Sequence, residues 1–221
     1  MKLSINILFL LLGAFVAVAQ QKTESMWQTV QLPIKLSSKL SLQTDAGYRT
    51  LGISVLPRVF LVRTGLRYHF STETNATAGV ALFFSKTSLN KAEHEFRKEF
   101  RLWQEVQQQL KLMKHTSFVI RLRTEQRFFE QTGLQKKFDA YRFRYRGTLQ
   151  QRLNEKLILQ AGFEYMHQLE DGVSHFNQYR IQPSLLWKIK KQFQFQTMYM
   201  IVKTPDELQR VLWMTWIYNI I

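Results

Sequence analysis

Apolar and polar side chains alternate with a period of two along most of the chain beyond residue 38. In residues 60–70 the even positions read Phe, Val, Thr, Leu, Tyr and Phe, whereas Arg63, Gly65, Arg67 and His69 occupy odd positions. Successive side chains of a β-strand point to opposite faces, so this alternation predicts strands with one apolar and one polar face. No apolar stripe with the 3.6-residue period of a helix runs over a comparable length.

The repeated pattern predicts ten strands from residue 39 onward, and a further segment at residues 26–34 also alternates. Because bacterial membrane barrels usually have an even number of strands, ten strands are expected, and twelve are the alternative. Two of the ten are long, at about 96–110 and 117–129. The expected fold class is therefore all-β, an antiparallel transmembrane β-barrel of about ten strands.

The connections between these strands alternate between tight turns and longer polar loops. The tight turns lie at residues 71–75, 112–115, 153–156 and 190–191, and the longer loops at 86–95, 130–137, 168–177 and 203–207. Short periplasmic turns alternating with longer outer loops are typical of outer-membrane barrels. A soluble β-sandwich or lipocalin-like barrel would also alternate. Strands of 13 or more residues, serial arginines on the polar face and aromatic residues near strand ends favour the membrane barrel.

The first 19 residues have the layout of a secretory signal peptide. Lys2 precedes an apolar run at residues 5–16, and Ala17, Val18 and Ala19 form an A-x-A cleavage site. This run is shorter than the roughly 20 apolar residues of a membrane-spanning helix. The sequence thus predicts a cleaved signal peptide at 1–19, a single barrel domain at 20–221, and location in the outer membrane.

Net charge narrows the choice of partners. The chain has a formal charge of +15, and removal of residues 1–19 takes away Lys2 and no acid, which leaves 30 basic and 16 acidic residues. Such an excess can indicate nucleic-acid binding, but export makes membrane lipid, lipopolysaccharide and a small anionic solute the expected partners instead. Cysteine is absent, which excludes disulfides and thiolate metal sites.

Charged residues gather on one face of three consecutive predicted strands, and they form the candidate site. The three sets are Glu99, Arg101, Trp103 and Glu105; Arg121, Arg123, Glu125 and Arg127; and Arg142, Arg144 and Arg146. On the polar face of a barrel strand, these side chains would point into the interior, as an ion network in the lumen.

Charge complementarity suggests how the first two of these strands pair. If opposed residue numbers sum to 226, three ion pairs and one cation–π contact align: Glu105 with Arg121, Arg101 with Glu125, Glu99 with Arg127, and Trp103 with Arg123. A sum of 228 would instead oppose Arg101 to Arg127. We therefore expect the register with a sum of 226.

Two functions fit an arginine-rich interior. Rings of arginine line anion-selective pores. A barrel of eight to ten strands can instead be filled by its own side chains, with the charges joined in a salt-bridged plug. The sequence leaves a small-solute or anion channel and a purely structural barrel both open.

From Trp27 to its end the chain resembles a family of uncharacterised outer-membrane barrels, domain-of-unknown-function family 2490, found mainly in Bacteroidota. The resemblance is carried by Trp27, the run Gly47, Tyr48 and Arg49, and the segments 122–128, 142–146 and 153–156. It implies a membrane barrel and brings no known activity or catalytic residues. Many such barrels end on Phe or Trp, whereas this chain ends on Ile221.

An enzyme that modifies membrane lipid, of the lipid A deacylase or phospholipase type, is the alternative function. Ser174 and His175 lie in a predicted long loop near Glu170 and Asp171, and His167 is a candidate second base. Polar loop composition explains these residues equally well. The histidines lack metal-ligand spacing and no glycine-rich phosphate loop is present, so we expect neither a metal nor a cofactor.

Overall fold

The computed structural model describes residues 22–50, 57–86, 95–133 and 135–220. The predicted signal peptide at 1–19 lies outside the described residues, as does most of the predicted loop at 86–95. No helix among the residues described is long and apolar enough to cross a membrane.

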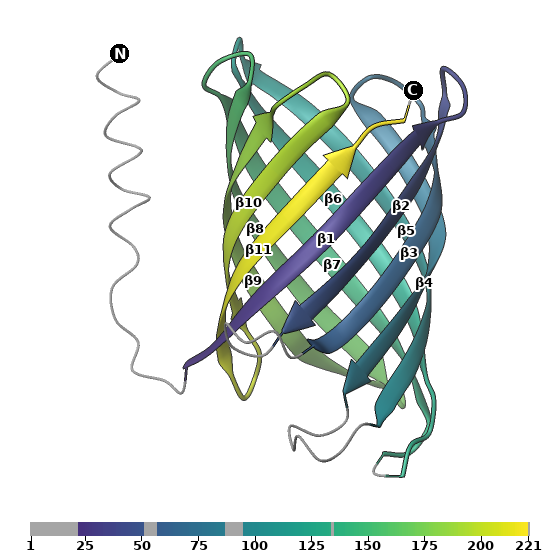
Figure 1. The fold of residues 1–221 in the computed structure, drawn as a ribbon. Coiled ribbons are helices and arrows are strands. Elements are labelled where there is room, and N and C mark those ends of the chain that lie inside the picture. The colour runs from purple at the N-terminus through teal and green to yellow at the C-terminus, as the bar shows by residue number, and fades with distance from the viewer. Residues whose placement is uncertain (1–21, 51–56, 87–94, 134, 221) are drawn as a thin grey trace.

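The described residues form eleven β-strands of 11 to 18 residues each (Figure 1). The strands are β1 (Lys22–Lys35), β2 (Leu40–Thr50), β3 (Pro57–His69), β4 (Thr74–Lys86), β5 (Phe96–Met113), β6 (Thr116–Phe129), β7 (Phe138–Arg152), β8 (Leu157–Glu170), β9 (Val173–Lys188), β10 (Phe193–Lys203) and β11 (Leu208–Tyr218).

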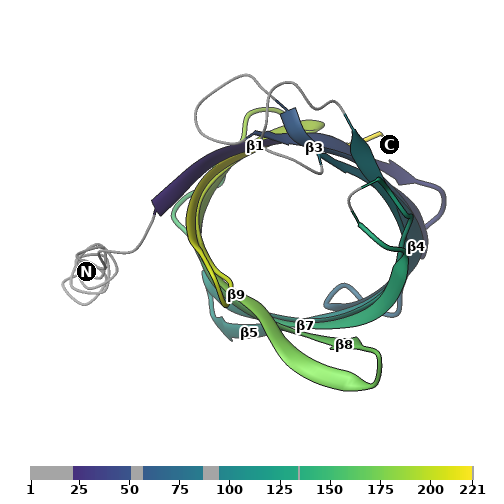
Figure 2. The ribbon, with the colours of Figure 1, turned by 90° about the horizontal axis from the view of Figure 1, so that it is seen from below.

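The strands close into one barrel, seen end-on as a ring in Figure 2. Each strand pairs antiparallel with the next along the chain, and β1 closes the ring by pairing parallel with β11, so that Trp27 aligns with Trp213. The expectation of ten or twelve strands was wrong, because residues 26–34 belong to β1, which pairs with both β2 and β11 and brings the number of strands to eleven. With an odd number, the first and last strands run in the same direction, and a parallel ladder still leaves no exposed edge.

Alternation along each strand separates an inner face from an outer face, as the sequence predicted. On β3 the outer Phe60, Val62 and Leu66 are exposed, whereas the inner Leu61 is buried. The same rule places the odd positions of β5 and β6 and the even positions of β7, β8 and β9 inside the barrel.

The two ends of the barrel differ in their connections. At the end where β11 finishes, which we call the turn end, connections are short, at residues 36–39, 70–73, 114–115, 153–156 and 189–192 (Figure 1). At the opposite end, the loop end, the connections after β4 and β6 are the long ones. This matches the predicted alternation of turns and loops except at two predicted loops: 203–207, where only residues 204–207 join β10 to β11, and 168–177.

The predicted loop at residues 168–177 is instead a tight hairpin. Strand β8 continues to Glu170 and β9 begins at Val173, so only Asp171 and Gly172 form the turn. Their φ angles of 50° and 78° are both positive, which suits a two-residue turn whose twist matches that of the flanking strands. The Asp-Gly pair was the sequence signal for this turn.

Candidate functional site

The candidate residues of β5, β6 and β7 all face the barrel interior. Of the eleven, Arg127 and Arg146 are partly buried, and every other one is buried. Two further charged residues join them, Glu164 of β8 and Arg180 of β9, both buried. The sequence reading did not single these two out, although each lies on the polar face of its strand.

The expected register between β5 and β6 was wrong. Opposed residue numbers sum to 228, which places Arg101 opposite Arg127 and Glu105 opposite Arg123. The like-charge pair that argued against this register is tolerated because Glu99, on the same face as Arg101, binds both guanidinium groups, at 2.5 Å and 2.6 Å. Long arginine side chains reach acids that are not their direct cross-strand neighbours, so charge alone does not select the register.

The ion pairs predicted from the sequence nevertheless form, as diagonal contacts. Glu99 binds Arg127 at 2.6 Å, and the N···O distances of Arg101 to Glu125 and of Arg121 to Glu105 are both 3.4 Å. The guanidinium carbon of Arg123 lies 4.5 Å from the ring centroid of Trp103. Each predicted pair is therefore in contact, but the register is different, and the shortest contact of Glu105 is to Arg123, at 2.6 Å, which was not predicted.

Glu125 and Glu164 are the centres of the network. Glu125 contacts Arg142, Arg144 at 2.7 Å and Arg101 at 3.4 Å. Glu164, which has no exposed surface, contacts Arg121, Arg144 at 2.9 Å and Arg180 at 3.7 Å. Because Arg144 binds both carboxylates, it joins the two centres into one network across β6, β7, β8 and β9. A buried carboxylate needs such partners to remain charged.

Two glycines make room for Trp103. Gly65 of β3 and Gly79 of β4 are cross-strand neighbours, and Gly79 is in turn opposite Trp103 of β5. A Cβ atom at Gly65 would lie 2.6 Å from the Trp103 ring, and one at Gly79 would lie 2.8 Å from it. The indole therefore lies against the bare backbone of both strands, where Arg123 stacks on it.

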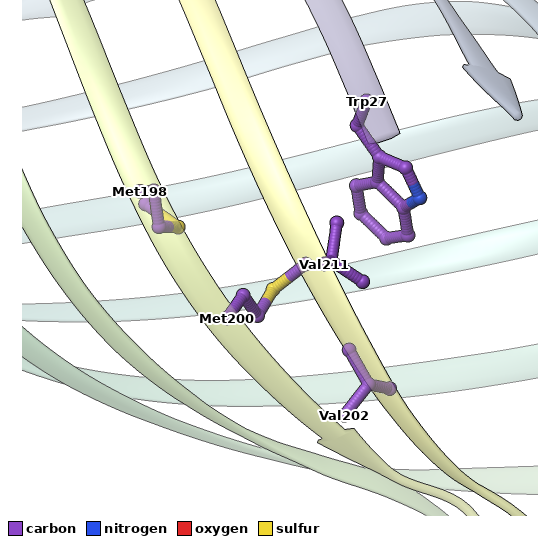
Figure 3. Packing of buried hydrophobic residues seen from close by; sticks show 5 residues of the cluster. All are labelled: Trp27, Met198, Met200, Val202 and Val211. Atoms are coloured by element: carbon purple, nitrogen blue, oxygen red, sulfur yellow. The ribbon is translucent and has the colours of Figure 1, made fainter. Parts of the chain in front are cut away.

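An apolar cluster lies on the inner wall where the barrel closes. Trp27 of β1, Met198, Met200 and Val202 of β10, and Val211 of β11 form a buried cluster (Figure 3). Trp213 packs against this cluster and meets the Trp27 ring edge-on, with centroids 5.5 Å apart. The charged residues of the interior thus come from β2, β3 and β5–β9, and β1, β10 and β11 contribute this apolar cluster.

Arginines outnumber acids on the described inner face. Eleven arginines line the two interior cavities described below: Arg49, Arg63, Arg67, Arg101, Arg121, Arg123, Arg127, Arg142, Arg144, Arg146 and Arg180; the acids in these linings or bound to these arginines are Asp45, Glu99, Glu105, Glu125 and Glu164. Within the described part of the chain, no carboxylate oxygen lies within 4 Å of Arg49 or Arg146. The interior therefore has a surplus of positive charge that its own acids do not neutralise.

Two cavities lie inside the barrel. The turn-end cavity, of about 320 Å³, is lined by Gln31, Gln107, Gln150 and other residues near the short turns. The loop-end cavity, of about 300 Å³, is lined by residues such as Trp27, Phe83 and Phe129. Four residues line both cavities and form the waist between them: Arg63, Arg144, Arg180 and Trp213.

Of the residues of the lipid-enzyme alternative, Glu170 is linked to the ion network through Gln168, which donates to Glu170 at 2.8 Å and accepts from Arg127 at 2.6 Å. Ser174 and His175 are exposed residues of β9 beside the Asp171–Gly172 turn rather than members of a long loop. His167 is on the outer face of β8, where its ring stacks on Phe143 and Tyr145 with centroids 4.9 Å and 5.7 Å apart.

Comparison with known proteins identifies a family and one structural likeness. A family model described as "Protein of unknown function (DUF2490)" matches residues 24–207, a segment that begins in β1 and ends before β11. A solved structure titled "KdgM porin" is similar at 10% sequence identity and a TM-score of 0.46, over 81% of this chain and 91% of that one. Among curated proteins, none matches this chain.

Proposed function

This chain belongs to the DUF2490 family, and we propose that it is an outer-membrane β-barrel whose interior admits small anions. The observation that carries the proposal is the surplus of arginine around the two interior cavities, eleven arginines against five acids among the described residues. A narrow, positively charged passage attracts anions and repels cations, because charges inside it are screened less than charges on a protein surface.

The outer face supports placement in a membrane. Near the turn end, Phe195 of β10 packs on Trp216 of β11 with ring centroids 4.4 Å apart. Near the loop end, Tyr145 and Tyr165 gather around His167 on the outer face. Apolar residues such as Val62, Leu66 and Val80 are exposed on the same outer face. An apolar band between two aromatic girdles is the usual surface of a barrel in a bilayer.

The residues of the waist are the ones that an anion would contact as it moves between the two cavities. Arg63, Arg144 and Arg180 border both cavities, so an anion that leaves one cavity for the other passes guanidinium groups throughout. The ion network keeps these arginines in place, because Arg63 binds Asp45 at 2.8 Å and Arg144 binds Glu125 at 2.7 Å. The same contacts narrow the passage, so only small solutes are expected to cross.

Conductance in planar bilayers tests the proposal. With the purified full chain and a KCl gradient, the reversal potential should have the sign of a chloride-selective pore, and Arg180→Gln should move it toward zero. Arg210→Gln, on the outer face of β11 next to the exposed Leu212, is the matched control and should leave it unchanged. A folded barrel without conductance would support the salt-bridged plug instead.

Membrane location has its own test. Cell fractionation followed by detergent extraction should recover the protein with the outer membrane, and its gel mobility should change on heating. N-terminal sequencing of that fraction should begin at Gln20 if residues 1–19 are removed. Recovery as a freely soluble periplasmic protein would contradict the proposal.

The lipid-enzyme alternative is tested in the same strain. Lipid A mass spectrometry of cells that lack the protein should show no change under the anion proposal. A change in acylation that Ser174→Ala reproduces would replace the anion proposal by an enzymatic one.

A further inference from the structure

The loop-end cavity differs from the turn-end cavity in its charge. Each cavity is lined by seven arginines, but the turn-end lining includes Asp45, Glu105 and Glu164, whereas the loop-end lining includes only Glu99 among the described acids. The lining of the loop-end cavity therefore has fewer acids for the same number of arginines than the lining of the turn-end cavity.

Five of the seven loop-end arginines have a strong acidic partner. Arg63 binds Asp45 at 2.8 Å, Arg101 and Arg127 bind Glu99, and Arg142 and Arg144 bind Glu125. Acids of the protein hold these five guanidinium groups in place. The five arginines therefore contribute positive potential to the cavity, while many of their hydrogen-bond donors are already used.

Arg49 and Arg180 are different. Arg49 has no carboxylate within 4 Å among the described residues, and its guanidinium carbon lies 3.8 Å from the ring centroid of Trp27. Arg180 reaches Glu164 only at 3.7 Å, donates from Nε to Gln178 at 3.3 Å, and lies 5.4 Å from the same Trp27 centroid. Two under-neutralised guanidinium groups thus flank one buried indole.

We propose that the loop-end cavity binds one small oxyanion between Arg49 and Arg180, beside Trp27. Guanidinium donors match the paired oxygens of carboxylate and phosphate groups, and an anion between two arginines also removes their mutual repulsion. The volume of about 300 Å³ is at the lower end of the range for ligand pockets, so the ligand is small. This binding site extends the proposed function to a specific ligand class, and it rests on that function because the anion enters through the lumen.

Inorganic phosphate is the probe, titrated by calorimetry into the full chain in detergent, with chloride replaced so that ionic strength stays constant. Binding should saturate at one site. Arg49→Gln and Arg180→Gln should each weaken it roughly tenfold or more, the typical effect of losing a hydrogen bond to a charged group. Arg67→Gln is the matched control, because Arg67 lines only the turn-end cavity, and it should change the affinity less than about twofold.

Two results would overturn the site. One is phosphate binding that does not saturate, and the other is a loss of affinity in Arg67→Gln as large as that in Arg49→Gln and Arg180→Gln. Either result would indicate attraction by the general positive charge of the interior. Arg49→Lys guards against misfolding of the glutamine variant, because it keeps the charge and loses the two-pronged geometry; an intermediate affinity is expected. Binding needs no conductance. Saturable binding by a barrel that does not conduct would retain the site and refute the passage, and anion-selective conductance without saturable binding would do the reverse.

Discussion

Arg101 and Arg127 lie directly opposite each other in the ladder between β5 and β6. Both donate from Nε to the same oxygen of Glu99, at 2.5 Å and 2.6 Å. The two arginines are therefore compatible neighbours only while Glu99 remains charged between them. This dependence on a shared acid recurs at Glu125 and Glu164 and underlies the first two predictions.

Glu99→Gln should destabilise the barrel. It leaves Arg101 with Glu125 at 3.4 Å and Arg127 with the side chain of Gln168 at 2.6 Å, and it removes the charge between two opposed arginines. Breaking a buried ion pair from one side costs about 3 kcal/mol or more. Urea unfolding in lipid vesicles measures the change. Glu130→Gln, which removes the partner of Lys98 in an exposed pair, should cost less than about 1 kcal/mol. Equal losses in the two variants would contradict the shared-acid interpretation.

Glu125→Gln and Arg142→Gln should not be additive. Arg142 donates twice to Glu125, and either single change leaves the other member buried without its main partner. The double variant should lose less stability than the sum of the two single losses, by about 1 kcal/mol or more. The control cycle combines Glu125→Gln with Arg67→Gln, whose acidic neighbour is Glu105 at 3.9 Å. The stability losses of these two single variants should add to within about 0.5 kcal/mol in the double variant. A strong coupling in this control cycle would mean that the effect comes from overall charge rather than from the contact between Glu125 and Arg142.

Gly65→Ala should disturb the position of Trp103. The added methyl would lie 2.6 Å from the indole, so the ring must move away from β3 and from its contact with Arg123. Overpacking of this kind costs about 1–3 kcal/mol. Thermal unfolding compares it with Gly133→Ala, where the nearest atom to the new methyl is an oxygen of Glu95 at 3.8 Å. If Gly65→Ala left the stability unchanged, the indole of Trp103 would be able to move into a different position without cost, and the prediction would be wrong.

The turn between β3 and β4 gives a pH prediction. Hydrogen bonds from Lys111 and then Thr72 hold the pKa of Glu73 at about 2, below its ordinary value of 4.5. A lowered pKa stabilises the fold above pH 4.5, and this contribution is lost as the pH falls through about 2. Lys111→Met should raise the pKa of Glu73 toward 4.5, and Thr72→Val should raise it less. Carboxyl NMR titration measures both; identical values in Lys111→Met and the parent chain would refute the contact.

Period-two alternation was sufficient to predict the barrel wall. Because a strand can place only every second side chain inside, the inward position of Arg121, Arg123 and Glu125 followed from their spacing alone. The ion partners of Glu99 and Glu105 also followed, since a buried acid requires a nearby base. Residues 26–34 also alternate, but less decisively than the ten later segments, and an expectation of even strand number led to the wrong count.

Only the tertiary structure decided the register, the closure and the division of the interior. The pattern of charges along one strand does not fix how far that strand is shifted relative to its neighbour, because long arginine side chains can reach several acids. The pairing of Arg101 with Arg127 therefore could not be predicted from charge. Parallel pairing of β1 with β11 depends on closure of the whole ring. Arg49 meets Trp27 as its direct partner in the β1–β2 ladder, whereas Arg180 of β9, 131 positions beyond Arg49 in the chain, comes close to the same ring only because the barrel closes. The sequence by itself thus determined which face each side chain occupies, a local property of the backbone, while long-range closure determined which side chains meet.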